Sequence, residues 1–217
     1  PDVTMSDYQL SDGDVIEVLF TANYMDEPGL FLPFTDVNNH WAYSAIKRVY
    51  NRGLMLGVSD TRFAPNQALS RAMLVTVLWR LAGAPAPKGV NTFSDVPGGT
   101  WYTDAVTWAA ENGVVSGIGG GCFAPNSNVT REQTAVILFN YAHSCGYDVG
   151  ARADLSAFPD AGSVSGWAQD ALSWANAAGL INGTVYGGRT ILDPQGSASR
   201  AQVAMILRSY AEHVVNA

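Results

Sequence analysis

Three arginines each follow a hydroxyl residue at corresponding points along the chain. The three pairs are Ser70-Arg71, Thr130-Arg131 and Ser199-Arg200. A serine or threonine at such a point caps the helix that follows, and the first amides of a helix attract anions. An arginine beside those amides can hold a carboxylate through two parallel hydrogen bonds. The pattern therefore predicts three candidate anion sites, each at the start of a helix.

Aromatic and small residues recur ahead of each arginine and could complete a binding surface. A tryptophan stands 30 to 33 residues before each arginine, and a glycine lies between the two. The tryptophans are Trp41, Trp101 and Trp167, and the glycines are Gly57, Gly117 and Gly183. An indole offers a flat apolar face to the C–H side of a sugar, and a glycine lets a ligand approach the backbone closely. The alternative that the tryptophans belong to the core stays open.

These residues belong to a unit that occurs three times. The copies begin with Phe34-Thr35-Asp36, Phe93-Ser94-Asp95 and Phe158-Pro159-Asp160, and each ends with a hydroxyl-arginine pair. Insertions lengthen the third copy before Trp167 and around residues 186–190, and both are rich in glycine or serine, as surface loops are. Several landmarks in one order predict a tandem repeat. The aspartates could form salt bridges with the arginines or cap and brace the neighbouring helix. Both residue types therefore have a possible structural role besides ligand binding.

Each repeat is predicted to contain two helices joined by a loop. The first helix begins near the tryptophan, because Trp101, Ala105 and Trp108 of the second repeat fall on one helical face with Ala109. A glycine suits the left-handed position just past the end of that helix. These glycines are Gly53, Gly113 and Gly179.

The second helix of each repeat is predicted to start at the hydroxyl residue. Thr130 with Gln133 and Ser199 with Gln202 can form capping boxes, whereas Met73 takes the reciprocal position in the first repeat. The second helices are apolar nearly all round, which is typical of helices in a core. We therefore expect an all-α fold of three tandem helix-loop-helix repeats, whose second helices pack as a central bundle with pseudo-threefold symmetry.

We divide the chain into an N-terminal segment and three repeats. Residues 1–30 are expected to carry a short β segment, either the tail of an upstream domain or a hairpin on the bundle. The repeats are placed at residues 31–84, 90–146 and 155–214. Because Pro1 is not a natural start, the chain is expected to be processed or a fragment.

Composition argues against several classes of protein. The 217 residues carry a net charge of −7 and only two lysines, whereas nucleic-acid binding needs a basic face. No run of 18 apolar residues occurs, so we expect no membrane span. The histidines and cysteines lack the spacing of zinc ligands, and we expect no metal and no cofactor. Cys122 and Cys145 flank a predicted helix, which makes a disulfide between them unfavourable.

The sequence does not predict an enzyme. A glycosidase needs two carboxylates facing one bond, and the five glutamates do not recur among the repeats. The chain also lacks a nucleophile elbow, a Cys–His arrangement and a phosphate-binding loop. We therefore expect a module that binds without catalysis.

The combined pattern resembles the S-layer homology (SLH) domain, whose usual number of tandem copies is three. It consists of F-x-D-V, W-A, two glycines around a hydrophobic pair, F-x-P-N and a hydroxyl-arginine pair, and it extends from Phe34 to His213. The resemblance implies a pseudo-trimeric helical module outside the cell, which anchors bacterial surface proteins non-covalently to secondary cell wall polysaccharide. That glycan often carries pyruvylated N-acetylmannosamine, and the pyruvyl ketal presents a carboxylate.

The resemblance also ranks the repeats. The family's Thr-Arg-Ala-Glu motif appears as Ser70-Arg71-Ala72-Met73, Thr130-Arg131-Glu132-Gln133 and Ser199-Arg200-Ala201-Gln202. All three arginines are kept and all three glutamates are replaced. We expect Arg131 and Arg200 to contribute more than Arg71, because their repeats retain the capping box.

The candidate ligand-binding residues comprise one set of five positions in each repeat. They are Arg71, Arg131, Arg200, Trp41, Trp101, Trp167, Ser70, Thr130, Ser199, Gly57, Gly117, Gly183, Asp36, Asp95 and Asp160. The expected partner is cell wall polysaccharide, and neighbouring surface-layer subunits could also bind. Two alternatives stay open: a protein–protein assembly module of a surface layer, and a degenerate SLH fold that has lost its ligand.

Overall fold

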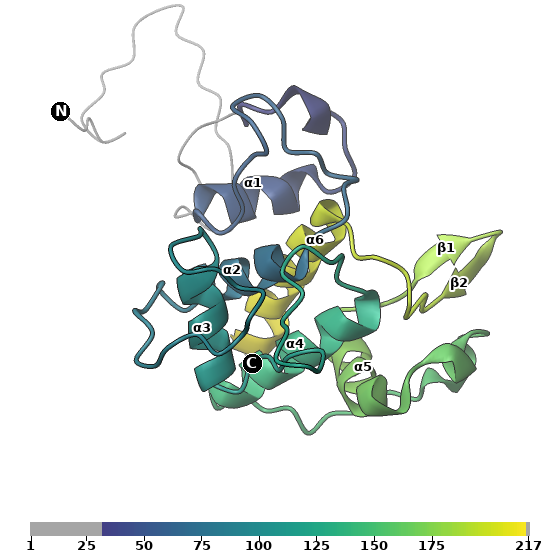
Figure 1. Ribbon diagram of the computed structural model, residues 1–217. Coiled ribbons are helices and arrows are strands. Elements are labelled where there is room, and N and C mark those ends of the chain that lie inside the picture. The colour runs from purple at the N-terminus through teal and green to yellow at the C-terminus, as the bar shows by residue number, and fades with distance from the viewer. Residues whose placement is uncertain (1–31, 216–217) are drawn as a thin grey trace, which may run out of the picture.

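Six α-helices, two in each repeat, form most of the regular structure in residues 32–215, which are the residues that this computed structural model describes (Figure 1). They are α1 Tyr43–Asn51, α2 Arg71–Leu81, α3 Thr103–Glu111, α4 Arg131–Ser144, α5 Gln169–Ala177 and α6 Arg200–Tyr210. The prediction of a mainly helical fold with two helices in each repeat is confirmed. The β segment predicted within residues 1–30 lies outside the described residues.

Shorter elements connect the helices. Turns of 3-10 helix span Thr35–Val37, Leu155–Ala157, Ala161–Ser163 and Gly166–Ala168, and a π-helical turn over Ala211–Val215 continues α6. Strands β1 Thr184–Tyr186 and β2 Arg189–Ile191 form an antiparallel hairpin. Its turn residues Gly187 and Gly188 both have positive φ, as a tight two-residue hairpin turn requires. This hairpin takes the place of the second insertion in the third repeat, where the sequence indicated only a surface loop.

The helix starts follow the capping pattern. Thr130 and Ser199 form complete capping boxes with Gln133 and Gln202, and Ser70 accepts only the single bond from the helix amide. The first helices begin two residues after their tryptophan in repeats 1 and 2. Trp101 therefore lies before α3 rather than on its buried face, which corrects the expected helical stripe. The glycines past these helices all have φ near the left-handed value. Their φ angles are +67° at Gly53, +69° at Gly113 and +69° at Gly179.

Helix packing runs in a cycle through the repeats. Helix α2 packs on α3, α4 packs on α5, and α6 returns to pack on α1. Each second helix thus makes its most extensive helix contact with the first helix of the following repeat, rather than with the other second helices as the sequence predicted. The reason is that each first helix buries one apolar face, which the apolar side chains of a second helix cover.

Three backbone hydrogen bonds close this cycle just before the second helices. The Leu69 amide donates to the Ala198 carbonyl at 2.9 Å, the Ala198 amide donates to the Val129 carbonyl at 3.0 Å, and the Val129 amide donates to the Leu69 carbonyl at 2.9 Å. All three residues are buried. One residue from each repeat therefore serves once as donor and once as acceptor, which joins the three repeats at one point of the core.

Candidate functional site

Three grooves lie beside the second helices, and each is named here by its arginine. The Arg71 groove has a volume of about 390 Å³, the Arg131 groove about 260 Å³ and the Arg200 groove about 140 Å³. Each groove has a second helix on one side and, on the other, the loop that follows the first helix of the same repeat. The arginine and a tryptophan complete the lining.

Each groove is assembled from all three repeats. In the Arg71 groove, the arginine comes from repeat 1, the loop 114–118 and helix α4 come from repeat 2, and Trp167 comes from repeat 3. The Arg131 groove combines that arginine with loop 179–184, α6 and Trp41. The Arg200 groove combines its arginine with loop 54–57, α2 and Trp101. The arginine of one repeat thus lines the groove beside the second helix of the next repeat.

The arginines are almost completely buried and bind backbone carbonyls. Arg71 Nε donates to the Phe123 carbonyl at 2.9 Å, and Arg200 Nε donates to the Phe63 carbonyl at 2.7 Å. The guanidinium carbons also lie 4.8 Å and 4.4 Å from the centres of those phenylalanine rings, a cation–π distance. Arg131 Nε donates to the Leu192 carbonyl at 2.7 Å, with an aliphatic side chain in place of the ring.

Burial also sets the protonation behaviour of these arginines. Desolvation lowers the pKa of Arg71, Arg131 and Arg200 below the ordinary value of an arginine. Nearby carboxylates oppose the shift: Asp95 near Arg71, Asp193 and Asp160 near Arg131, and Asp36 near Arg200. Arginine stays charged in proteins, so each groove holds one buried cation at neutral pH.

The aspartates do not line the grooves, and they do not cap the first helices. Asp95 accepts hydrogen bonds from the Phe123 and Ala124 amides at 2.7 Å each. Asp36 and Asp160 accept equivalent pairs of amides in their own repeats. No ion pair within 4.0 Å joins an aspartate to one of the three groove arginines in the described residues. Carboxylate and guanidinium instead hold opposite sides of one peptide segment, as Asp95 and Arg71 do at Phe123.

These bonds lower the pKa of two of the aspartates. At Asp95 the amide of Phe123 is the main cause, because it stabilises the ionised carboxylate. At Asp36 desolvation acts in the opposite direction, but the amides of Phe63 and Ala64 outweigh it and the pKa is still lowered.

The helix starts are not open to an anion, which corrects the prediction from the sequence. The Arg71 amide donates to the Ser127 carbonyl at 2.9 Å, and the next amide, of Ala72, donates to the Pro125 carbonyl at 3.0 Å. The third amide bonds to the capping hydroxyl of Ser70. Helices α4 and α6 have the same arrangement. Ser70, Thr130 and Ser199 therefore cap helices and join repeats, and none of them lines a groove.

The tryptophans lie at the surface and line the grooves. Trp41 is 63% exposed, Trp101 58% and Trp167 60%. Each tryptophan lines the groove beside the second helix of the preceding repeat: Trp167 beside α4, Trp41 beside α6 and Trp101 beside α2. The alternative that they belong to the core is therefore excluded. Buried tryptophans do occur, but they are Trp108 and Trp174 within the first helices.

The three glycines of the loops line the grooves but have an internal reason to be glycine. A Cβ on Gly117 would lie 2.6 Å from the Cys122 carbonyl oxygen and 3.0 Å from the Phe93 ring. Gly57 and Gly183 meet equivalent backbone and phenylalanine atoms of their own repeats. Close packing within each repeat therefore requires glycine whether or not a ligand approaches.

Sequence reasoning missed the polar residues that the second helices place in the grooves. Gln133 and Asn140 line the Arg71 groove, and Gln202 and Ser209 line the Arg131 groove. The glutamines were identified only as parts of capping boxes. Their spacing of seven residues from Asn140 and Ser209, two helical turns, is the signal that could have placed them on one face.

Another missed residue joins repeats 2 and 3. The buried carboxylate of Glu132 accepts hydrogen bonds from the Ser165 amide at 3.0 Å and from the Ser165 hydroxyl at 2.9 Å. It also accepts a bond from the Gln195 side-chain amide at 2.8 Å. This network is structural, because Glu132 lines none of the three grooves.

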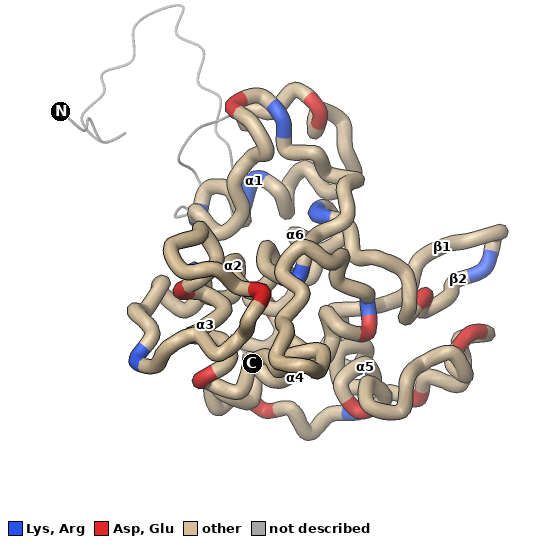
Figure 2. The backbone as a smooth tube through the Cα atoms, in the orientation of Figure 1, with Lys and Arg blue, Asp and Glu red and all other residues tan. Residues whose placement is uncertain are grey.

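Charges are sparse over the described residues. In the view of Figure 2, basic positions are interspersed with acidic ones rather than gathered on one side. No group of three histidine, cysteine, aspartate or glutamate side chains suited to a metal occurs in residues 32–215, where Cys122 and Cys145 are free thiols. The helices of this part of the chain are all too short or too polar to cross a membrane. The groove arginines are thus local cations in a protein of net negative charge.

Comparison with known families now identifies the fold. The sequence profile of the S-layer homology domain matches residues 33–72, 92–135 and 157–204, more than half of the chain. The chain therefore belongs to the S-layer homology domain family, with three repeats. The predicted resemblance is confirmed.

Individual relatives agree with this assignment. The chain is 32% identical to the surface-layer 125 kDa protein of Lysinibacillus sphaericus over 80% of its own length and 14% of the relative. It is 29% identical to an amylopullulanase of Thermoanaerobacterium thermosulfurigenes over 88% of its length and 10% of the relative. It is 30% identical to the exoglucanase XynX of Acetivibrio thermocellus over 80% of its length and 16% of the relative.

The chain thus spans only 10% to 16% of the length of these three relatives. The match is a shared module, and the enzymatic names belong to proteins that consist mostly of other regions. The family and its surface-layer relatives indicate a cell-surface, cell-wall-associated location for this chain.

Proposed function

We propose that this chain is a non-catalytic anchoring module that binds anionic secondary cell wall polysaccharide in its inter-repeat grooves. The observation that carries the proposal is the composition of each groove: a buried guanidinium, an exposed indole and the edge of a loop. The guanidinium has five N–H donors, and within residues 32–215 Arg71 uses two of them for the Phe123 and Ser116 carbonyls. Its remaining donors would hold a carboxylate, such as that of a pyruvyl ketal, while the indole stacks on the sugar ring.

We further propose that the three repeats are related by pseudo-threefold symmetry. The cyclic packing of α2 on α3, α4 on α5 and α6 on α1 supports this proposal. The cyclic amide bonds among Leu69, Val129 and Ala198 support it independently. Such symmetry would present up to three related sites to one polysaccharide, and linked sites strengthen binding without new contacts.

The grooves are not expected to bind equally. The initial ranking placed Arg131 and Arg200 above Arg71 because their own repeats keep the capping box. Each arginine, however, lines the groove of the next repeat, so Arg71 lies with Gln133 and Arg131 lies with Gln202. We therefore rank the Arg71 and Arg131 grooves above the Arg200 groove.

The Arg200 groove differs from the others in its lining as well as its size. It has Met73 where the other two have glutamine, Leu56 where they have Ser116 and Asn182, and the half-buried Arg80 where they have Asn140 and Ser209. Arg80 donates to the Leu54 carbonyl of its own repeat at 3.2 Å. Met73 and Leu56 make the lining less suited to the hydroxyl groups of a sugar, because an apolar side chain cannot replace the hydrogen bonds that those hydroxyls make in water. We propose that this groove contributes least to anchoring.

Co-sedimentation with purified cell-wall sacculi tests the function. We expect the chain to pellet with intact sacculi, and to stay in solution once acid has removed the secondary polysaccharide. The double substitution Trp41→Ala/Trp167→Ala should weaken binding about tenfold or more, because both better grooves lose their stacking face. These side chains are exposed, so the variant should keep the fold, which circular dichroism would verify.

Trp101→Ala is the matched control, because Trp101 is as exposed as the others but lines the smallest groove. It should change binding at most slightly. Binding that survives acid treatment would contradict the proposal and indicate peptidoglycan or protein as the partner, the assembly alternative. A chain that binds neither preparation would fit the degenerate alternative.

A further inference from the structure

The β1–β2 hairpin extends one wall of the Arg131 groove. Its first residue, Thr184, belongs to the lining of that groove. The strands then continue away from the groove, and Figure 1 shows the hairpin projecting beyond the helices. The corresponding loops of repeats 1 and 2 each form only an isolated bridge, Ser59 with Arg62 and Gly119 with Cys122. In the described residues the Arg131 groove therefore differs from the other two in having a two-stranded hairpin that begins at its lining.

The register of the hairpin determines which residues share the face of Thr184. Thr184 pairs with Ile191, and Tyr186 pairs with Arg189. Side chains of directly paired residues lie on one face, and side chains two residues apart on a strand lie on the same face. Tyr186 and Arg189 therefore share the face of Thr184, whereas Val185 and its partner Thr190 lie on the other.

The burial of the hairpin residues indicates which face turns toward the groove. Thr184 and its partner Ile191 are half-buried, whereas Val185 and Thr190 on the other face are exposed. Because Thr184 lines the Arg131 groove, the face that carries it is the one beside the groove, and Tyr186 with Arg189 lie further out on that same face.

We propose that Tyr186 and Arg189 form an additional subsite for the anionic polysaccharide, one that contacts a sugar beyond those held in the Arg131 groove. This inference rests on the proposed function. Tyr186 is 77% exposed without an apolar cover, and Arg189 is an exposed cation in a chain of net charge −7. A tyrosine ring that can stack on a sugar, opposite a guanidinium that can bind a carboxylate, repeats on the hairpin the chemistry of the groove.

The proposed subsite lies outside the groove by about two residues of strand, or roughly 6.6 Å. A ligand short enough to fit within the groove would not reach it. The subsite should therefore affect only the binding of extended chains, which separates its contribution from that of the groove.

The test compares two lengths of one glycan in isothermal titration calorimetry. The probes are secondary wall polysaccharide extracted with acid and its fragments of a single repeating unit, each titrated into the full 217-residue chain. Tyr186→Ala and Arg189→Gln should each weaken binding of the long glycan about tenfold and leave binding of the fragment unchanged. Val185→Thr is the matched control on the opposite face, and it should leave both affinities unchanged.

The outcomes separate this inference from the proposed function. If the unaltered chain binds both probes and the Tyr186 and Arg189 variants do the same, the subsite is wrong and the groove function stands. If Val185→Thr weakens binding as much as Tyr186→Ala does, the assignment of faces is wrong. If the unaltered chain binds neither probe, the proposed function fails and the subsite fails with it.

Discussion

At the scale of single residues, the recurring aspartates and arginines form hydrogen bonds to backbone segments of the protein itself. Phe123 is the clearest example, because Asp95 accepts its amide while Arg71 donates to its carbonyl. The two side chains come from different repeats, so their bonds fix the loop of repeat 2 against α2. An arginine with this role is oriented by the fold, which reduces the entropy that it loses when it binds a ligand.

Asp95→Asn should lower thermal stability, because an asparagine side chain has one acceptor oxygen for two backbone amides. At pH 7 we expect the Tm to fall by roughly 2–4 °C. The pKa of Asp95 is lowered by folding, so its contribution is fully present above the ordinary value of 3.8 and is lost as the pH falls through the lowered pKa. The difference between the variant and the parent should therefore close in strong acid.

Melting curves recorded from pH 7 down to the acid limit would check this prediction. Asp148→Asn is a suitable control, because the bond of Asp148 in the described part of the chain is to the nearby Gly150 amide within one exposed loop. A difference at Asp95 that is constant over the whole pH range would show that the ionised carboxylate is not the source of the stability.

At the scale of elements, the loop between the helices of each repeat depends on close packing as well as on its own hydrogen bonds. Gly57, Gly117 and Gly183 leave no room for a side chain next to the phenylalanine that opens the repeat. The same loops form the groove walls opposite the second helices. The shape of a groove thus depends on an internal contact of its repeat.

Gly117→Ala should destabilise the chain, because the new Cβ would lie 2.6 Å from a backbone oxygen that cannot rotate away. We expect a loss of about 1–3 kcal/mol of unfolding free energy, as for other overpacked sites. Gly98→Ala is the matched control: the glycine has an ordinary φ and no atom within 4 Å of the added carbon. Urea unfolding of both variants would measure the difference. Equal stabilities would show that the loop relaxes without cost.

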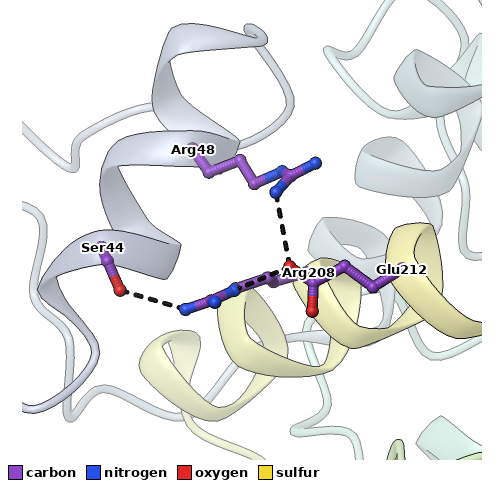
Figure 3. Close-up of polar contacts among 4 residues, drawn as sticks. All are labelled: Ser44, Arg48, Arg208 and Glu212. Carbon is purple, nitrogen blue, oxygen red and sulfur yellow. Dashed lines mark hydrogen bonds and ion pairs between the residues drawn. The ribbon is translucent and has the colours of Figure 1, made fainter. Parts of the chain in front are cut away.

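At the scale of the whole molecule, the cycle of repeats is closed between the first helix and the last. Figure 3 shows Glu212, which follows α6, accepting contacts from two arginines. Arg48 of α1 lies 3.4 Å from its Oε1 atom, and Arg208 of α6 lies 3.0 Å from the same atom. Arg208 also donates to the Ser44 hydroxyl of α1 at 3.3 Å. Repeats 1 and 3 are thereby joined although more than 160 residues separate these side chains.

Glu212→Gln should weaken this closure and lower the stability of the whole chain by about 0.5–1 kcal/mol, because the ion pairs of Glu212 with two arginines are lost in a partly exposed site. Each repeat depends on its neighbours for a helix partner, so unfolding should remain a single transition. Tryptophan fluorescence and far-UV circular dichroism should therefore give the same midpoint.

Asp170→Asn serves as the control for this prediction. Asp170 is 89% exposed and lies 3.8 Å from Arg152, so its removal should leave the midpoint almost unchanged. Two separate transitions in the Glu212→Gln variant would mean that the repeats fold independently, contrary to the cyclic packing.

The local elements and the family were predictable from the sequence, because both depend on residues that are close along the chain. Thr130 with Gln133 marks a helix start through a bond spanning three residues, and Gly113 marks a helix end through its own backbone angle. The apolar composition of α2 predicted its burial in the same way. Arg71 and Trp167 were recognised as recurring residues for the same reason.

Only the tertiary structure decided which of these residues share a site. Arg71, Gln133 and Trp167 come from three different repeats, and the period of the sequence does not reveal that each arginine serves the next repeat. The helix-start amides were expected to be open because sequence cannot show that the Ser127 and Pro125 carbonyls of another repeat occupy them. Pairings over such separations are set by how the apolar faces of α2 and α3 pack, which is a property of the assembled chain rather than of any segment.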